Sequence, residues 1–66
     1  MRAVTTPDQV LGRSLKVERV MAGAKLTDIA AAAGISAGHL SNIEAGKRSA
    51  SPELIARIRS AIRAAA

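Results

Sequence analysis

Residues 36–48 hold the side chains of this chain that are best suited to recognising another molecule. The Asn42 amide combines donors and an acceptor, so it can bond N6 and N7 of an adenine together. The Ser41 hydroxyl can bond either a base edge or a phosphate oxygen. Lys47 and Arg48 follow directly, and their cations suit phosphate groups. The chemistry open to this stretch is therefore hydrogen bonding to bases and ion pairing with phosphates.

Two short helices joined by a tight turn are predicted to position these side chains. The first starts near residue 25 or 26 and ends at Ala33, where Ile29, Ala30 and Ala33 give it an apolar face of small side chains. Ala30 stands where a close crossing with another helix would fall. Gly34 then accepts a positive φ without steric cost, which ends a helix abruptly.

The second helix is predicted over about residues 36–45. Ser36 can cap its N-terminus, and Gly46 stops it. Leu40 and Ile43 place its apolar stripe back against the first helix. The face opposite that stripe is therefore expected to lie in solvent.

Two further helices are predicted, one on each side of this pair. Thr6 and Gln9 form a capping box that starts the first of them, and Gly23 ends it. Ser51 caps the other, followed by a proline in the first helical position. Its apolar stripe is continuous and consists of Leu54, Ile55, Ile58, Ala61 and Ile62.

The composition favours an all-α fold. The chain has 66 residues, no aromatic residue and no cysteine. Sheets favour aromatic and β-branched residues in an alternating pattern, which is absent here. Short, closely packed helices can instead build a core from Leu, Ile, Val, Met and Ala. We therefore expect a compact bundle of four short helices, with residues 1–5 as a flexible N-terminal arm and residues 6–66 as a single domain.

The charge favours a polyanionic partner and the residue types argue against catalysis. The net charge is +5, which favours binding to phosphates through release of counterions. The sequence contains no nucleophile–base pair and no glycine loop that could cradle a phosphate, so we expect no enzymatic activity. With His39 as its single histidine, the chain is expected to bind no metal, no cofactor and no small-molecule ligand. Neither a membrane-spanning run nor a signal peptide is visible, so we expect no membrane partner and a cytoplasmic location.

The chain resembles the lambda-repressor-like helix-turn-helix family of the Cro/xenobiotic-response-element type, from about Leu11 to Ile62. The resemblance rests on many positions at uninterrupted spacing and not on a single residue. These positions are Leu11-Gly12, Leu15, Arg19, Ile29-Ala30, Gly34-Ile35-Ser36, Leu40-Ser41, Ile43-Glu44 and Gly46-Lys47-Arg48. Among the departures, Lys25 occupies the customary Ser or Thr cap position of the second helix.

The resemblance implies both a structural ion pair and a function. Arg19 is expected to pair with Glu44, which would hold the second helix of the motif at a fixed angle. The protein would be a transcriptional regulator of the repressor or Cro type, bacterial or from a phage, that occupies an operator in double-stranded DNA. Because family members bind as two-fold dimers on inverted half-sites, we expect a homodimer, formed in free solution or only on the DNA.

The helix at 36–45 would then enter the major groove as the recognition helix. The residues expected to read bases from its outward face are Asn42, Ser41, Ala37 and Gly38. The residues expected to contact phosphates lie in the loop after this helix, on the helix itself and at helix N-termini, and they are Lys47, Arg48, Ser36, His39, Thr27 and Lys25.

Two other functions remain open from the sequence. An architectural, excisionase-like factor would bend DNA strongly and bind tandem sites. A protein-interaction module of the antitoxin or antirepressor kind would keep the fold without reading DNA, and the small residues Ala37 and Gly38 on the reading face are compatible with it. Binding to double-stranded DNA separates this module from the other two functions.

Overall fold

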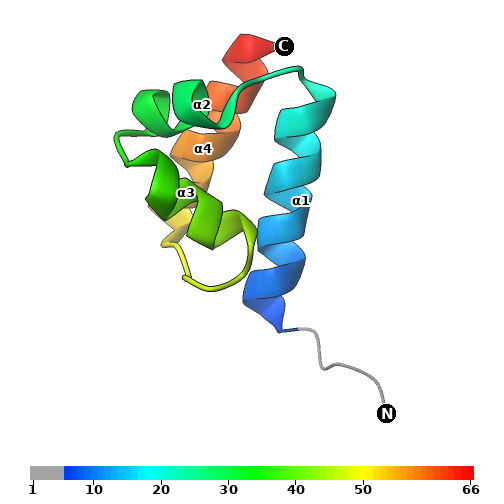
Figure 1. Cartoon of the computed structure of the whole chain (residues 1–66), viewed down its shortest axis with the longest axis vertical. Coiled ribbons are helices and arrows are strands. Elements are labelled where there is room, and N and C mark those ends of the chain that lie inside the picture. The colour runs from blue at the N-terminus through cyan, green and yellow to red at the C-terminus, as the bar shows by residue number, and fades with distance from the viewer. Residues whose placement is uncertain (1–5) are drawn as a thin grey trace.

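The computed structural model describes residues 6–66 and contains four α-helices in this part of the chain. They are α1 (Pro7–Met21), α2 (Leu26–Ala33), α3 (Ala37–Glu44) and α4 (Pro52–Ala65). Figure 1 shows α1 along one side of the molecule, with α2, α3 and α4 gathered on the other. The predicted all-α bundle with a helix-turn-helix is confirmed. The flexible arm predicted at residues 1–5 lies outside the described residues.

The helix ends follow the capping residues that the sequence supplies. The Thr6 hydroxyl accepts from the Gln9 backbone N–H at 3.1 Å, and the Gln9 side chain accepts from the Thr6 N–H at 3.0 Å, which completes the predicted capping box. The Ser51 hydroxyl accepts from the Leu54 N–H at 3.1 Å. Lys25 makes no such bond at the start of α2.

The turn between α2 and α3 has the conformation that Gly34 was expected to provide. Gly34 has a φ of 77°, in the left-handed region. The N–H of Ile35 bonds the carbonyl oxygen of Ala30 at 2.9 Å, which closes the end of α2. Ser36 is extended and caps α3, so α3 is one residue shorter at each end than the predicted range 36–45.

All four helices contribute to an aliphatic core. The largest fully buried side chains are Leu15 of α1, Ile29 of α2, Leu40 of α3 and Ile58 of α4. Burying a side chain of this size stabilises the fold by about 1.5–3 kcal/mol. Ala30 is 1% exposed, because its small side chain lets α2 pack closely against its neighbours. The core therefore fixes α2 and α3 against the two longer helices.

Candidate nucleic-acid interface

One side of α3 is anchored in the protein. Leu40 is fully buried and Ile43 is 2% exposed, as the predicted inward stripe requires. Glu44, at the last turn, is 8% exposed and is a charged residue buried in the described part of the chain. A buried carboxylate needs a partner, and Glu44 has one on α1.

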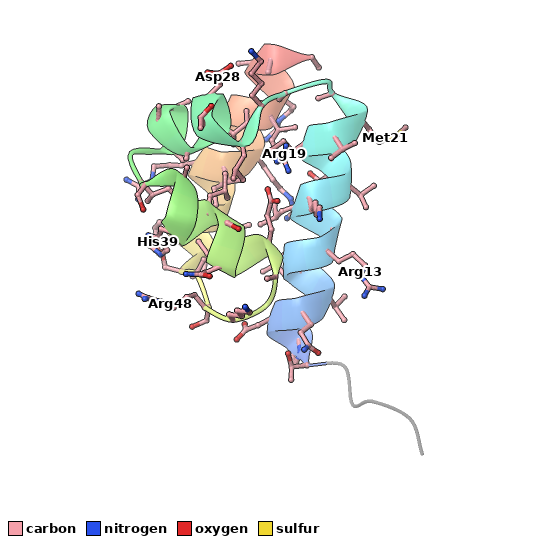
Figure 2. The ribbon with its side chains drawn as sticks, in the orientation of Figure 1. Arg13, Arg19, Met21, Asp28, His39 and Arg48 are labelled. Atoms are coloured by element: carbon pink, nitrogen blue, oxygen red, sulfur yellow. The ribbon has the colours of Figure 1, made fainter. Side chains whose placement is uncertain are left out.

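Glu44 forms a bidentate ion pair with Arg19. The Arg19 Nε donates to Glu44 Oε2 at 2.8 Å and the Arg19 Nη2 donates to Glu44 Oε1 at 3.1 Å. The remaining guanidinium nitrogen, Nη1, donates to the carbonyl oxygen of Ala24 at 3.0 Å. Figure 2 shows Arg19 pointing from α1 toward the interior of the bundle. One arginine therefore ties α1, the end of α3 and the loop before α2 together.

The ion pair also changes the acidity of Arg19. The hydrogen bond that Arg19 donates to Glu44 raises the pKa of the guanidinium above its ordinary value, and burial opposes this rise. Because the pKa is raised, the contribution of this ion pair to the stability of the fold is fully present at every pH below arginine's ordinary pKa. Arg19 therefore stays protonated at physiological pH, and its ion pair with Glu44 is retained.

Gly12 allows α1 to approach α3 at backbone distance. A Cβ atom at Gly12 would overlap the carbonyl oxygen of Ile43 and would lie 2.7 Å from that of Glu44. Gly12 was predicted only as part of the family resemblance, and this backbone contact was not predicted. A signal was present, because a glycine inside a helix is less stable than alanine by about 1 kcal/mol and so marks a packing requirement. Gly12 and Arg19 together set the position of α3.

The opposite side of α3 is open to solvent. Gly38, Ser41 and Asn42 are all exposed, and nothing lies within 4 Å of the position a Cβ would take on Gly38. Ala37 differs from the other three residues expected to read bases, since it is half-buried and packs against the core. Three small or medium polar positions therefore form the accessible surface of the helix.

Cationic and hydroxyl groups surround this surface. Lys47 and Arg48 are exposed directly after α3, and their backbone N–H groups bond the carbonyl oxygen of Asn42 at 2.9 and 3.3 Å. The Ser36 hydroxyl accepts from the His39 N–H at 3.0 Å, which leaves its own hydrogen free to donate. In Figure 2, His39 and Arg48 lie at the same edge of the molecule. The structure therefore brings these residues together around α3.

The start of α2 is a second group of candidate phosphate contacts. Lys25 and Thr27 are exposed there, and the absence of a side-chain cap leaves the first backbone N–H groups of α2 available. Asp28 adds an opposing negative charge in the first turn of α2. The first turn of α3 carries no acid, in contrast to those of the other three described helices. The N-terminus of α3 is therefore the more favourable of the two for an anion.

No role was predicted for the arginines of α4, and the structure pairs one of them, Arg59, with Glu18. Its Nη2 lies 3.3 Å from Oε2 of Glu18 on α1, and that oxygen also accepts from the Ser14 hydroxyl at 3.0 Å. Both charged side chains are more than a third exposed. No local signal marks a pair that is 41 positions apart, because it depends on how α1 and α4 cross.

Two general properties accompany this arrangement. Within residues 6–66, no three His, Cys, Asp or Glu side chains gather closely enough to hold a metal ion. No helix in that range combines the length and apolar character that crossing a membrane requires.

Comparison with known proteins supplies the family. A family model described as a helix-turn-helix domain matches residues 10–66, which include most of α1 and all of α2, α3 and α4. No curated protein and no solved structure matches the chain. Membership of this family indicates DNA binding of a regulatory kind, and its domains are typically not enzymes. The resemblance predicted from the sequence is confirmed: the chain belongs to the helix-turn-helix domain family, which is related to the Cro and xenobiotic-response-element type of DNA-binding domain.

Proposed function

We propose that this protein is a sequence-specific transcriptional regulator of the Cro or repressor type, which places α3 in the major groove of an operator. The observation that carries the proposal is the two-sided character of α3. Its inner side is anchored by Leu40, Ile43 and Glu44, while Ser41 and Asn42 lie free on its outer side. A recognition helix needs both properties, because base edges are read only by side chains whose position is fixed.

Asn42 is the proposed principal base reader, because its amide can bond adenine N6 and N7 together. Ser41 adds a hydroxyl that bonds a base edge or a phosphate. Gly38 permits close approach of the helix backbone to the DNA. Ala37, which lies at the edge of the protein core, offers its methyl group to a thymine methyl. Since these side chains are short, DNA shape and bridging water contribute to the specificity alongside direct contacts.

The phosphate contacts fix the orientation of α3 on the duplex. Lys47 and Arg48 provide charge beyond the end of α3, and Ser36 and His39 provide polar groups near its start. Thr27 and Lys25 at the start of α2 are proposed to contact the backbone as well. These contacts carry no sequence information, so they set affinity and its dependence on salt.

The proposed operator complex contains two copies of the chain. Two-fold related copies would read the two halves of an inverted repeat whose centres are about 34–36 Å apart. Such a homodimer represses or activates by occupying the operator, and its occupancy depends on the concentration of the protein.

Selection of binding sites from random double-stranded DNA, followed by footprinting, tests this proposal. We expect an enriched sequence protected over an inverted repeat, and binding that weakens steeply as salt rises. Strong bending with tandem protection would instead indicate an architectural factor. Failure to bind any duplex in dilute buffer would contradict the proposal and would favour a protein-interaction module.

A further inference from the structure

The outer side of α1 carries an apolar stripe that no other part of residues 6–66 covers. The stripe consists of Val10, Val17, Val20 and Met21, which are 58, 54, 57 and 82% exposed. These four are the large hydrophobic side chains that remain exposed in the described chain, and all belong to one helix. Exposed apolar residues are ordinary when they are scattered, but a continuous line of them marks an interaction surface.

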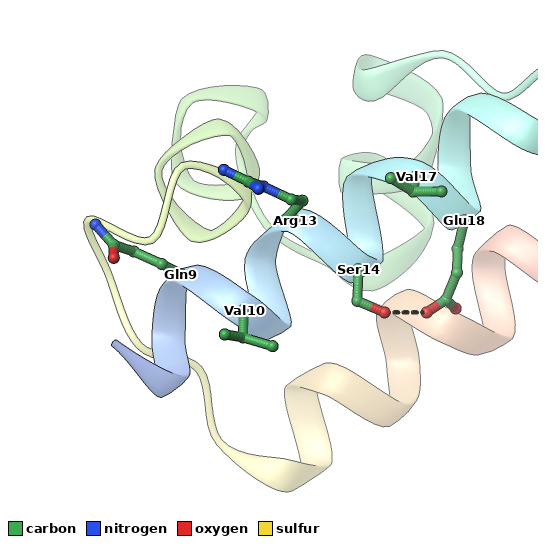
Figure 3. A pocket seen from close by; sticks show the side chains of 6 residues that line it. All are labelled: Gln9, Val10, Arg13, Ser14, Val17 and Glu18. Atoms are coloured by element: carbon green, nitrogen blue, oxygen red, sulfur yellow. Dashed lines mark hydrogen bonds between the residues drawn. The ribbon is translucent and has the colours of Figure 1, made fainter. Parts of the chain in front are cut away.

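The stripe borders a shallow, open groove on the surface of α1. An open hollow of about 420 Å³ lies on α1 and is lined by Gln9, Val10, Arg13, Ser14, Val17 and Glu18 (Figure 3). These six residues form two rows with a spacing of four, 9–13–17 and 10–14–18. A groove between two such rows is where the ridge of a neighbouring helix packs. Ser14 keeps the middle of the groove open, because its side chain is small.

The stripe faces away from the proposed DNA interface. In Figure 2, Arg13 and Met21 point to one edge of the molecule, whereas His39 and Arg48 lie at the opposite edge. Contact with DNA through α3 therefore leaves this surface of α1 accessible.

The charges beside the stripe are complementary to those of a second copy of α1. Val10, Ser14, Val17 and Met21 have the 4-3-4 spacing of a heptad seam, and Arg13 and Glu18 flank that seam on opposite sides. Their separation of five residues is the spacing at which flanking side chains meet between parallel helices. A two-fold axis along α1 would thus bring Arg13 of each copy to Glu18 of the other. An antiparallel pair would instead place each flank against its like-charged equivalent.

We propose that α1 is a self-association surface, on which a second copy of this chain packs its own α1 in parallel. The seam residues meet around the two-fold axis, and Arg13 of each copy bonds Glu18 of the other. Glu18 already accepts from the Ser14 hydroxyl at 3.0 Å and from two nitrogens of Arg59 at 3.3 and 3.4 Å. A carboxylate offers about four lone-pair sites and the Glu18 side chain is 38% exposed, so it can accept one further donor from Arg13 of the second copy. This contact is independent of DNA binding. When two chains are joined through α1 and each also binds DNA, their α3 helices face away from the two-fold axis. The pair then links two DNA-bound chains.

The proposed contact is weak by its size. The 15 residues of α1 span about 22 Å, and a helix of about 10 Å diameter offers a narrow strip for contact. The buried area therefore falls below the ~1,000 Å² that a stable interface needs. Self-association is expected at high protein concentration, or where two DNA segments that carry bound chains lie close together.

Sedimentation equilibrium of the whole chain over a concentration series up to the millimolar range tests the proposal. Arg13→Glu places like charges beside Glu18 of the partner and should weaken self-association by at least about tenfold. Lys16→Glu is the matched control, since Lys16 is also exposed on α1 but lies outside the groove. Equal weakening by both changes, or a wild-type chain that stays monomeric throughout, overturns the proposal.

Disulfide trapping provides a second test, because the chain contains no cysteine. Ser14→Cys would place two thiols across the two-fold axis within reach of a disulfide, so oxidation should yield a covalent dimer. Ser60→Cys, at an exposed position on α4, should yield far less. Equal yields from the two variants overturn the parallel arrangement.

DNA binding by a Val17→Glu variant separates this proposal from the proposed function. The added charge in the seam should abolish self-association, and binding of one chain to a single half-site should be unchanged. Ala56→Glu, an exposed position on α4 with the same change of charge, serves as its control. Binding to duplex DNA without self-association of the wild type overturns the α1 contact alone, and self-association without binding overturns the proposed function alone.

Discussion

The two contacts that α1 makes with its neighbours differ in kind. Toward α3, the Arg19–Glu44 pair is bidentate at 2.8 and 3.1 Å, and the two side chains are only 13 and 6% exposed. Toward α4, the Arg59–Glu18 pair is also two-pronged, but its bonds are longer, at 3.3 and 3.4 Å, and its side chains are 39 and 38% exposed. Removing one partner of a buried pair strongly destabilises a protein, whereas exposed pairs contribute little to its stability.

The difference teaches how the fold divides its tasks. The helix proposed to read DNA is held by a backbone contact at Gly12 and by a buried charge pair, so its orientation is fixed. In the contact between α1 and α4, the ion pair is only partly buried, with both side chains more than a third exposed. Removal of one partner from the buried pair should therefore lower the free energy of unfolding by about 2 kcal/mol more than removal of one partner from the exposed pair.

Glu44→Ala is expected to have the largest effect. It leaves the Arg19 guanidinium without its partner in a site that is largely closed to water, and should lower the free energy of unfolding by about 3 kcal/mol. That is a large part of the stability expected for a 66-residue domain. Urea unfolding followed by circular dichroism measures the change. A shift no larger than that of Glu53→Ala, which removes an exposed acid on α4, would show that the buried pair does not hold α3.

Gly12→Ala tests the backbone contact between α1 and α3. The added methyl group would overlap the carbonyl oxygen of Ile43, so we expect a loss of about 1–3 kcal/mol despite the better helix propensity of alanine. Gly38→Ala is the matched control, because Gly38 also lies inside a helix but has open space around it. It should raise stability by up to about 1 kcal/mol. Opposite signs in the same unfolding experiment would support the comparison, and equal signs would contradict it.

Features that depend on residues close together in the sequence were predicted correctly, and contacts between distant helices were not. The capping box of Thr6 and Gln9, the cap at Ser36 and the turn at Gly34 were predicted, because each depends on residues a few positions apart. The apolar stripes predicted for α2, α3 and α4 likewise lie in the core. Local rules of this kind do not contain the angle at which two helices cross.

The candidate site could be predicted only in part for the same reason. The exposed positions of Ser41 and Asn42 follow from the inward positions of Leu40 and Ile43 on one helix. The pairing of Arg19 with Glu44 came from the family resemblance and not from spacing. The close approach at Gly12 and the Arg59–Glu18 pair depend on contacts between distant segments, so they required the structure.

Asn42→Ala tests whether the rigid side of the molecule is also the reading side. Asn42 is exposed, so the fold should be unaffected, while discrimination against a wrong base at one operator position should fall by about 1–3 kcal/mol. Titrations with the selected operator and with single-base variants of it measure this loss. Affinity for unrelated DNA should stay nearly the same. An unchanged preference at every position would remove Asn42 from the base contacts.

Lys47→Ala should weaken binding to all sequences alike, because its proposed partner is a phosphate. The slope of the logarithm of the binding constant against the logarithm of salt concentration should become shallower by about one unit. Arg13→Ala provides a matched loss of charge away from α3, because Figure 2 places Arg13 at the edge of the molecule opposite Arg48. If both variants change the slope equally, net charge and not a contact at Lys47 determines the salt dependence.

Arg59→Ala is expected to have the smallest effect, and it tests the more exposed ion pair, between α1 and α4. Because both members of its ion pair are more than a third exposed, the free energy of unfolding should fall by less than about 1 kcal/mol. Operator binding should not change, since α3 is held by a different contact with α1, the Arg19–Glu44 pair. The substitution also leaves the Glu18 carboxylate free for Arg13 of a second copy, so self-association should be unchanged or slightly stronger. A loss of stability comparable to that of Glu44→Ala would mean that the α1–α4 contact is as firmly built as the α1–α3 contact, and the contrast between the two sides of α1 would not hold.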